Sequence, residues 1–157
     1  MATTPPPKLV RCPACGRTNR VPAAAAGKPR CGSCKAFLAW IAEAGDADFT
    51  GIAEQASVPV LVDFWAAWCA PCRTLSPALE QLATEKAGQL KLVKVDIDRA
   101  PRLAQRFSIH AVPTLLLLHY GKVIARHSGA APLPVLRDWL GDALTRIPSA
   151  SQPGGYR

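Results

Sequence analysis

The sequence lacks any apolar segment long enough to cross a membrane. A spanning helix needs about 18 or more consecutive apolar residues, whereas the apolar stretch over residues 58–72 is interrupted by Asp63 and the one over residues 111–120 is too short. The N-terminus also lacks the apolar core of a secretory signal. We therefore expect a cytoplasmic protein without a membrane partner. In that reducing compartment, cysteine pairs more often bind metals or catalyse redox reactions than form permanent disulfides.

Acidic residues are absent from the first forty positions, which hold seven basic residues, whereas residues 41–157 hold 12 basic and 11 acidic ones. The basic segment also has few large apolar side chains, so it cannot build a core without a cross-link. Prolines near the start and glycines near the end predict a disordered leader over residues 1–9 and a flexible tail over residues 147–157. Between these we expect a small basic unit over residues 10–40 and a larger domain over residues 46–146.

The six cysteines form three Cys-x-x-Cys pairs. Two pairs lie in the basic segment and are separated by 15 residues, which is the spacing of a zinc ribbon with four cysteine ligands. The expected ligands are Cys12, Cys15, Cys31 and Cys34. We expect one structural Zn²⁺ per chain, which would supply folding energy that the few apolar residues cannot, and no organic cofactor. Two disulfides, or unstructured thiols, are the alternatives.

The third pair lies in the stretch Trp68-Cys69-Ala70-Pro71-Cys72, between an apolar strand and a helix. A cysteine at a helix N-terminus has a lowered thiol pKa, because the free N–H groups and the helix dipole favour the thiolate. Cys69 is therefore the expected nucleophile. Cys72 is the expected resolving thiol, which closes a redox-active disulfide with Cys69 after attack on a target disulfide. Pro71 restricts the backbone between them. A purely structural cysteine pair is the alternative.

Strand-like and helix-like segments alternate after residue 46. Apolar runs predict strands, and helical spacing of leucines predicts helices, with Pro77 expected to kink the first long helix. The expected strands cover residues 58–66, 90–98, 114–120 and 121–129, and the expected helices cover residues 50–55, 72–88, 100–107 and 132–144. The last two strands follow each other directly and predict a hairpin. This order indicates an α/β fold with a mixed central sheet flanked by helices.

Residues 46–146 resemble the thioredoxin family. The resemblance is carried by the Trp-Cys-x-Pro-Cys motif at residues 68–72, by Pro77, and by Val112-Pro113-Thr114. With the cysteine-rich segment in front, the chain resembles the two-domain, zinc-containing bacterial thioredoxins. The resemblance implies a thioredoxin fold behind a zinc ribbon and a protein-disulfide reductase activity. Its implied partners are disulfide-containing client proteins and an NADPH-dependent thioredoxin reductase. Ala70 stands where the commonest members have glycine.

The resemblance also implies roles for individual residues. Asp63 would take the proton of Cys72, since a carboxyl buried in a doubly covered strand has a raised pKa; a solvent-facing Asp63 is the alternative. Lys94 would lie beside that carboxylate, although a solvated lysine is the commoner case. Pro113 would be a cis proline opposite the dithiol, with the Val112 backbone pairing with a client strand. Trp68 and Gly129 would belong to the docking surface, together with Ala70 and Pro71.

A second hypothesis is a binding module, in which the basic segment docks nucleic acid or an acidic protein. Clustered positive charge favours such partners. Single-strand binding also needs stacking aromatic side chains, and the segment has only Phe37 and Trp40, both at its end. We therefore expect a monomeric enzyme rather than a nucleic-acid-binding protein.

Overall fold

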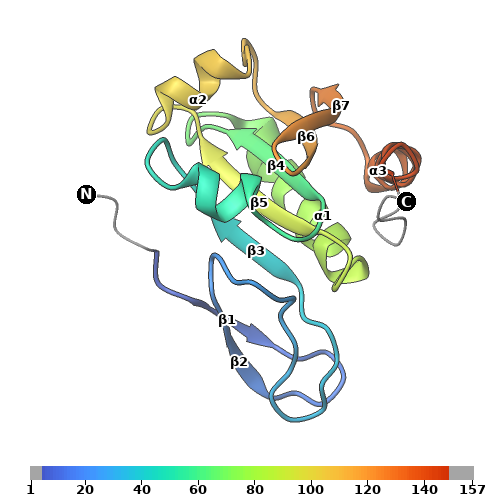
Figure 1. Cartoon of the computed structure of the whole chain (residues 1–157). Helices are drawn as coiled ribbons and strands as arrows, with labels where there is room; N and C mark the ends of the chain where they lie inside the picture. Colours follow the sequence, from blue (N-terminus) through green and yellow to red (C-terminus); the bar gives the residue numbers. More distant parts are fainter. Residues whose placement is uncertain (1–4, 149–157) are drawn as a thin grey trace.

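The computed structural model describes residues 5–148 and places a small hairpin in front of a five-stranded sheet (Figure 1). The hairpin pairs β1 (Lys8–Arg11) with β2 (Thr18–Val21) in antiparallel register. Residues 1–4 of the predicted leader and residues 149–157 of the predicted tail lie outside the described residues. Within them, β1 begins at Lys8, two residues before the predicted start of the small unit. We call residues 8–39 the ribbon.

The larger sheet has the strand order β3-β5-β4-β6-β7. Its strands are β3 (Trp40–Glu43), β4 (Val60–Trp65), β5 (Lys91–Asp96), β6 (Thr114–His119) and β7 (Lys122–Ser128). β3 and β4 run parallel to β5, β6 runs antiparallel to β4, and β6 and β7 form the predicted hairpin. The predicted mixed sheet is therefore confirmed. β4, β5 and β6 are buried along most of their length, as their continuous apolar runs indicate.

Helices cover both faces of this sheet. α1 (Ala70–Glu85) and α3 (Leu133–Leu144) pack on one face, where the buried leucines at positions 75, 79 and 82 of α1 meet those at 136 and 140 of α3. The single-turn π-helix η1 (Thr50–Glu54) and α2 (Pro101–Arg106) lie on the other face, beside a cluster that includes Phe49, Phe64 and Phe107. Pro77 lies inside α1. Among residues 5–148, no helix is both long and apolar enough to cross a membrane.

β3 is the one strand of the larger sheet that the sequence analysis missed. It has four residues, of which Trp40 and Ala42 are buried, and it pairs with β5, about fifty positions further along the chain. A strand this short carries little periodic signal of its own. The larger sheet therefore begins at Trp40, inside the segment that we had assigned to the small unit and its linker.

A buried lysine joins the ribbon to the sheet. The Lys91 ammonium donates hydrogen bonds to the carbonyl oxygens of Ala23, in the ribbon, and of Ile52, in η1. It also lies 4.0 Å from the centroid of the Trp40 ring, whose Nε1 donates to the Pro22 carbonyl at 2.9 Å. Burial lowers the pKa of Lys91 to about 8. The ribbon thus contacts the start of β5 through a side chain that is fully removed from solvent.

Candidate functional site

Cys69 and Cys72 form a disulfide where β4 passes into α1. Cys69 is the N-cap of α1, and its sulfur accepts a hydrogen bond from the Cys72 backbone N–H at 3.2 Å. Pro71 occupies the first turn, where a missing N–H costs no helical hydrogen bond. Free N–H groups at this end of the helix would stabilise a thiolate on Cys69 once the disulfide is reduced. The pair is thus placed as the sequence analysis expected.

The peptide bond between Val112 and Pro113 is cis and faces the disulfide. The Val112 carbonyl oxygen lies 3.7 Å from the Cys69 sulfur. The backbone N–H of Gly129 donates to the Pro113 carbonyl at 2.9 Å, which brings a third segment to the same place. Three segments that are far apart in the sequence therefore meet around the two sulfur atoms.

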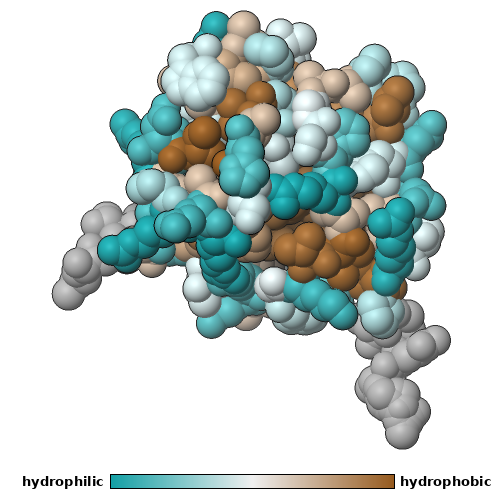
Figure 2. Space-filling model, turned by 90° about the horizontal axis from the view of Figure 1, so that it is seen from above, coloured by the Kyte–Doolittle hydropathy of each residue, from teal (hydrophilic) through white to brown (hydrophobic). Residues whose placement is uncertain are grey.

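Trp68 is the most exposed large side chain beside the disulfide, with 68% of its surface accessible. Its indole N–H donates to the Asp98 carboxylate at 3.0 Å, which fixes the ring against the loop after β5. Ala70 and Pro71, next along the chain, are also exposed. Seen from above, the molecule carries separate apolar patches among polar side chains (Figure 2).

Asp63 lies in the middle of β4 and is only 2% exposed, which excludes the solvent-facing alternative. Burial raises the pKa of its carboxyl to about 6, against an opposing contribution from the charge of Lys94. Its Oδ1 has no hydrogen-bond partner among the described residues. The carboxyl and Cys72 both face a cavity of about 250 Å³, whose other lining residues are Glu43, Trp65, Arg73, Ser76 and Lys94. A cavity of this size holds several water molecules, which can bridge the two groups.

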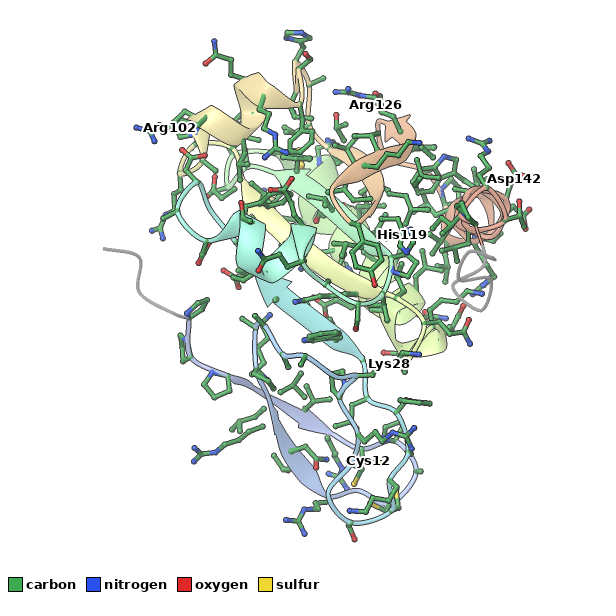
Figure 3. The ribbon with its side chains drawn as sticks, viewed as in Figure 1. Cys12, Lys28, Arg102, His119, Arg126 and Asp142 are labelled. Carbon is green, nitrogen blue, oxygen red and sulfur yellow. A yellow bond between two sulfur atoms is a disulfide. The ribbon has the colours of Figure 1, made fainter. Side chains whose placement is uncertain are left out.

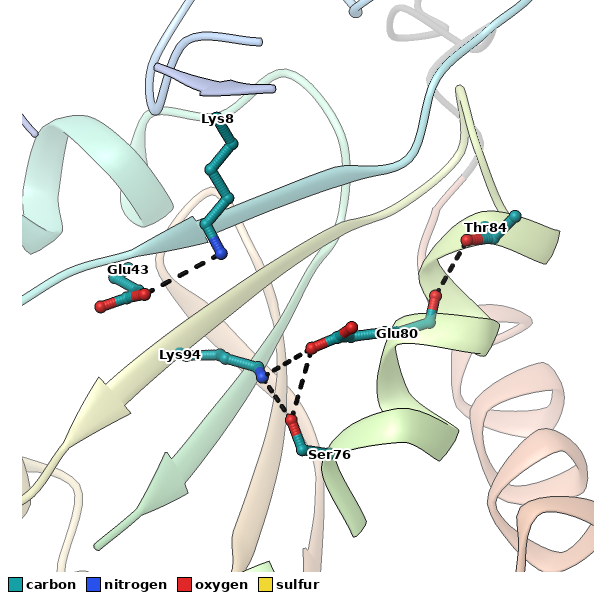
Figure 4. Close-up of polar contacts among 6 residues, drawn as sticks. All are labelled: Lys8, Glu43, Ser76, Glu80, Thr84 and Lys94. Carbon is teal, nitrogen blue, oxygen red and sulfur yellow. Dashed lines mark hydrogen bonds and ion pairs between the residues drawn. The ribbon is translucent and has the colours of Figure 1, made fainter. Parts of the chain in front are cut away.

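Lys94 is the register partner of Asp63 on the neighbouring strand, but its ammonium is bound elsewhere. It donates to the Ser76 hydroxyl and, at 3.0 Å, to the Glu80 carboxylate, both on α1 (Figure 4). Ser76, Glu80 and Glu43 were not among the predicted site residues. The spacing of positions 76 and 80 places them on one face of the helix, but it does not show that this face meets Lys94. Glu43 could not be placed from the sequence, because its strand was not predicted.

The four remaining cysteines form a compact cluster at the end of the ribbon that points away from the larger sheet (Figure 3). All four sulfur atoms lie within 4.8 Å of one another. The sulfurs of Cys12 and Cys34 are 3.6 Å apart, and those of Cys15 and Cys31 are 3.5 Å apart. A tetrahedral zinc site with bonds of about 2.3 Å would have sulfur-to-sulfur edges of about 3.8 Å. The cluster can therefore hold a metal ion.

The two turns that carry these cysteines have the same backbone pattern. Gly16 and Lys35, each directly after a pair, have positive φ angles of 82° and 67°, and each donates its N–H to the carbonyl of the first cysteine in its pair. The backbone N–H of Cys34 lowers the pKa of the Cys31 thiol to about 6. Asn19, which the sequence analysis missed, accepts a hydrogen bond from the Gly32 N–H at 2.9 Å. The two turns thus bring the four sulfur atoms close enough together to hold one cation.

Comparison with known proteins agrees with this geometry. The family profile for thioredoxin matches residues 40–142. "Thioredoxin" of Haemophilus influenzae is 40% identical over 95 residues, covering 60% of this chain and 89% of that protein. "Thioredoxin C-3" of Corynebacterium nephridii is 34% identical over 139 residues, covering 87% of this chain and 95% of that protein. The second alignment is longer than the part of the chain that follows the ribbon, so it must include part of the ribbon.

Proposed function

Because the chain belongs to the thioredoxin family of thiol–disulfide oxidoreductases, we propose that it reduces protein disulfides through Cys69 and Cys72. The observation that carries this proposal is the disulfide at the N-terminus of α1, facing the carbonyl that precedes a cis proline. A thiolate formed there has helix N–H groups to stabilise it and a neighbouring backbone on which an extended client segment can pair.

The reduced protein would react in two steps. The Cys69 thiolate attacks one sulfur of the client disulfide, which forms a mixed disulfide and releases the other client sulfur as a thiolate. Cys72 then loses its proton to Asp63, directly or through water in the shared cavity, and attacks the Cys69 sulfur. This second step forms the Cys69–Cys72 disulfide and releases the second client thiolate. Two electrons pass to the client, so a two-electron reductant must restore the dithiol, and we assign this role to an NADPH-dependent thioredoxin reductase.

Clients would dock on the surface around the disulfide. We assign this surface to the residues beside the two sulfur atoms, which are Trp68, Ala70, Pro71, Val112, Pro113 and Gly129. The exposed ring of Trp68 supplies apolar area, while the Val112 backbone supplies hydrogen-bonding groups. Asp63 is the proposed proton acceptor, and Lys94 modulates its pKa.

We further propose that Cys12, Cys15, Cys31 and Cys34 hold one structural Zn²⁺. The compact set of four sulfur atoms supports zinc, which favours thiolate ligands in tetrahedral geometry. When bound, the ion cross-links the two turns of the ribbon. The alternative function, a nucleic-acid-binding module, is disfavoured because Trp40 is 1% exposed and the ring of Phe37, although 36% exposed, already contacts Gly88 and the Arg30 guanidinium. We also propose that the protein is cytoplasmic and monomeric.

The two catalytic cysteines can be distinguished by substitution. Cys72→Ser should lose insulin reduction but accumulate client proteins as mixed disulfides through Cys69, because attack is intact and resolution is not. Cys69→Ser should lose both reduction and trapping. The measurement is a non-reducing gel after incubation of each variant with cell extract. Equal trapping by both variants, or trapping only by Cys69→Ser, would show that the two roles are assigned wrongly.

A further inference from the structure

Three charged residues form a row across the sheet beside the disulfide. Glu43 on β3 and Asp63 on β4 are both register partners of Lys94 on β5, which lies between these two strands. Register partners in neighbouring strands have their side chains on the same face of a sheet. A lysine is therefore flanked by two carboxylates, of which Asp63 is buried and Glu43 is exposed at the sheet edge.

The ribbon reaches this row through Lys8. The Lys8 ammonium lies 3.9 Å from the Glu43 carboxylate, so the two form a partly exposed ion pair (Figure 4). On the other side, Lys94 is only 15% exposed and is held by Ser76 and Glu80 rather than by Asp63. The charges thus alternate in sign from the ribbon, through Glu43 and Lys94, to α1.

Glu43 and Lys94 also stand between two cavities. Both residues and Trp65 line the cavity that contains Asp63 and Cys72, and the same three residues line a neighbouring cavity of about 270 Å³ that Pro5 and Arg99 also border. Glu43 therefore forms part of the wall between the buried carboxyl and the ribbon side of the molecule. Glu43 lines the same cavity as Asp63, but no hydrogen bond joins these two residues in the described part of the chain.

We propose that Glu43 is a positioning residue for proton transfer at Cys72: its carboxylate, paired with Lys8 of the ribbon, offsets part of the positive charge that Lys94 presents to Asp63. This inference rests on the proposed function of Asp63 as proton acceptor. It gives the ribbon a direct electrostatic contact with the reaction, in addition to any structural role of its metal.

The charged groups around Asp63 determine whether each substitution favours or disfavours its ionised form. The groups facing its cavity are Glu43 from β3, Lys94 from β5, and Cys72 and Arg73 from α1, with Glu80 of α1 and Lys8 of β1 behind them. Arg73 donates to the Ala67 carbonyl at 2.5 Å, which ties its guanidinium to the loop before α1. Removing the charge of Glu43 takes away a repelling carboxylate and leaves less negative charge to offset that of Lys94, and both changes favour ionised Asp63. Removing the charge of Lys8 leaves Glu43 uncompensated and acts in the opposite direction.

The test is a pH titration of the Asp63 carboxyl carbon by NMR in the reduced full-length protein. Glu43→Gln should lower the Asp63 midpoint by a few tenths of a pH unit, and Lys8→Gln should raise it by a smaller amount. Glu85→Gln is the matched control, because Glu85 is also a salt-bridged carboxylate on the surface but pairs with Arg137, outside the cavity. That variant should leave the midpoint unchanged.

A second background tests whether the effect passes through Lys94. In Lys94→Met, the shift caused by Glu43→Gln should fall to half or less of its value in the wild-type background. An unchanged midpoint in Glu43→Gln, shifts of the same sign in Glu43→Gln and Lys8→Gln, or a full shift without Lys94 would each overturn the proposal. The titration does not depend on client reduction, which is assayed separately with insulin. A failure of the positioning role is therefore distinguishable from a failure of the proposed activity.

Discussion

The buried carboxyl of Asp63 links the site to the stability of the whole chain. Its folded-state pKa of about 6 lies above the value of 3.8 for a free aspartate side chain. Between these pH values the folded protein keeps a proton that the unfolded chain has lost, so stability falls as pH rises from about 4 to about 6. Above about pH 6 the folded protein bears the full free-energy cost of the buried Asp63 charge.

We therefore expect Asp63→Asn to be more stable than the wild type at neutral pH. The shift corresponds to a gain of up to about 3 kcal/mol in the free energy of unfolding, because one pKa unit equals about 1.4 kcal/mol. The difference should shrink as pH falls to 4. Urea unfolding of both proteins at several pH values measures it, and the same variant should resolve mixed disulfides more slowly. A stability difference that does not change with pH would contradict a raised pKa at this position.

At the level of single residues, the sequence was informative where a motif constrains geometry. The motif at residues 68–72 predicted a dithiol at a helix start, and the family resemblance predicted that Pro113 is cis. The partner of Lys94 could not be predicted in the same way. Asp63 and Glu80 are both within reach of that lysine, and only the positions of β5 and α1 decide that the Glu80 carboxylate receives its ammonium.

At the level of secondary-structure elements, the joint between β3, β5 and the ribbon depends on Lys91. Its ammonium satisfies two carbonyl oxygens, and its position over the Trp40 ring adds a cation–π contact. Lys91→Met keeps the length of the side chain but leaves both carbonyl oxygens without this donor. We expect a loss of about 2–4 kcal/mol in unfolding free energy, since buried acceptors left unpaired cost about 1–3 kcal/mol each and the apolar replacement recovers part of that.

Two measurements check this prediction. Urea unfolding should give the overall loss, and hydrogen exchange should show faster opening of the amides in β2 and β3 than of those in β6. Lys122→Met, at an exposed position of β7, is the control and should change stability by less than about 0.5 kcal/mol. Equal effects of the two substitutions would mean that Lys91 does not hold the joint.

Helices and strands with a clear local sequence pattern were predicted, and those without one were missed. Continuous apolar runs predicted β4, β5 and β6, and leucines at helical spacing predicted α1 and α3. β3 was missed because its four residues owe their conformation to β5 and to the burial of Trp40. The strands β1 and β2 were not predicted either, since each has only four residues and half of these eight residues are exposed.

At the scale of the whole molecule, the two cysteine-bearing regions can be separated by removing the metal. Cys12→Ser should abolish binding of the proposed Zn²⁺ and unfold the ribbon, because its small core contains Cys12 and Cys31 themselves. The five-stranded sheet should survive, since both of its cores consist almost entirely of residues after position 40. Metal analysis, far-ultraviolet circular dichroism and insulin reduction report the three outcomes. Complete unfolding of the variant would show that the ribbon and the sheet form one cooperative unit.

The order of the two regions was predictable, but their docking was not. The charge step at residue 40 and the spacing of the cysteines both indicated a separate basic segment. The contacts that hold it join positions far apart in the chain, such as Phe37 with Gly88 and Ala23 with Lys91. Gly88 has a φ of 82°, and a Cβ at that position would lie 2.6 Å from the Phe37 ring. No local sequence pattern predicts the contact between Phe37 and Gly88.

The edge position of β3 has a consequence for solubility. In the described residues, β3 pairs only with β5, so its outer edge offers free backbone groups to which a strand of another molecule could add. Pro5, Pro6 and Pro7 line the same cavity as Ile41, Ala42 and Glu43. Proline has no N–H to donate, so a proline segment beside this edge cannot extend the ladder. The three prolines are therefore unsuited to recruit a strand of another molecule, and the charged pair of Lys8 and Glu43 lies at the same edge.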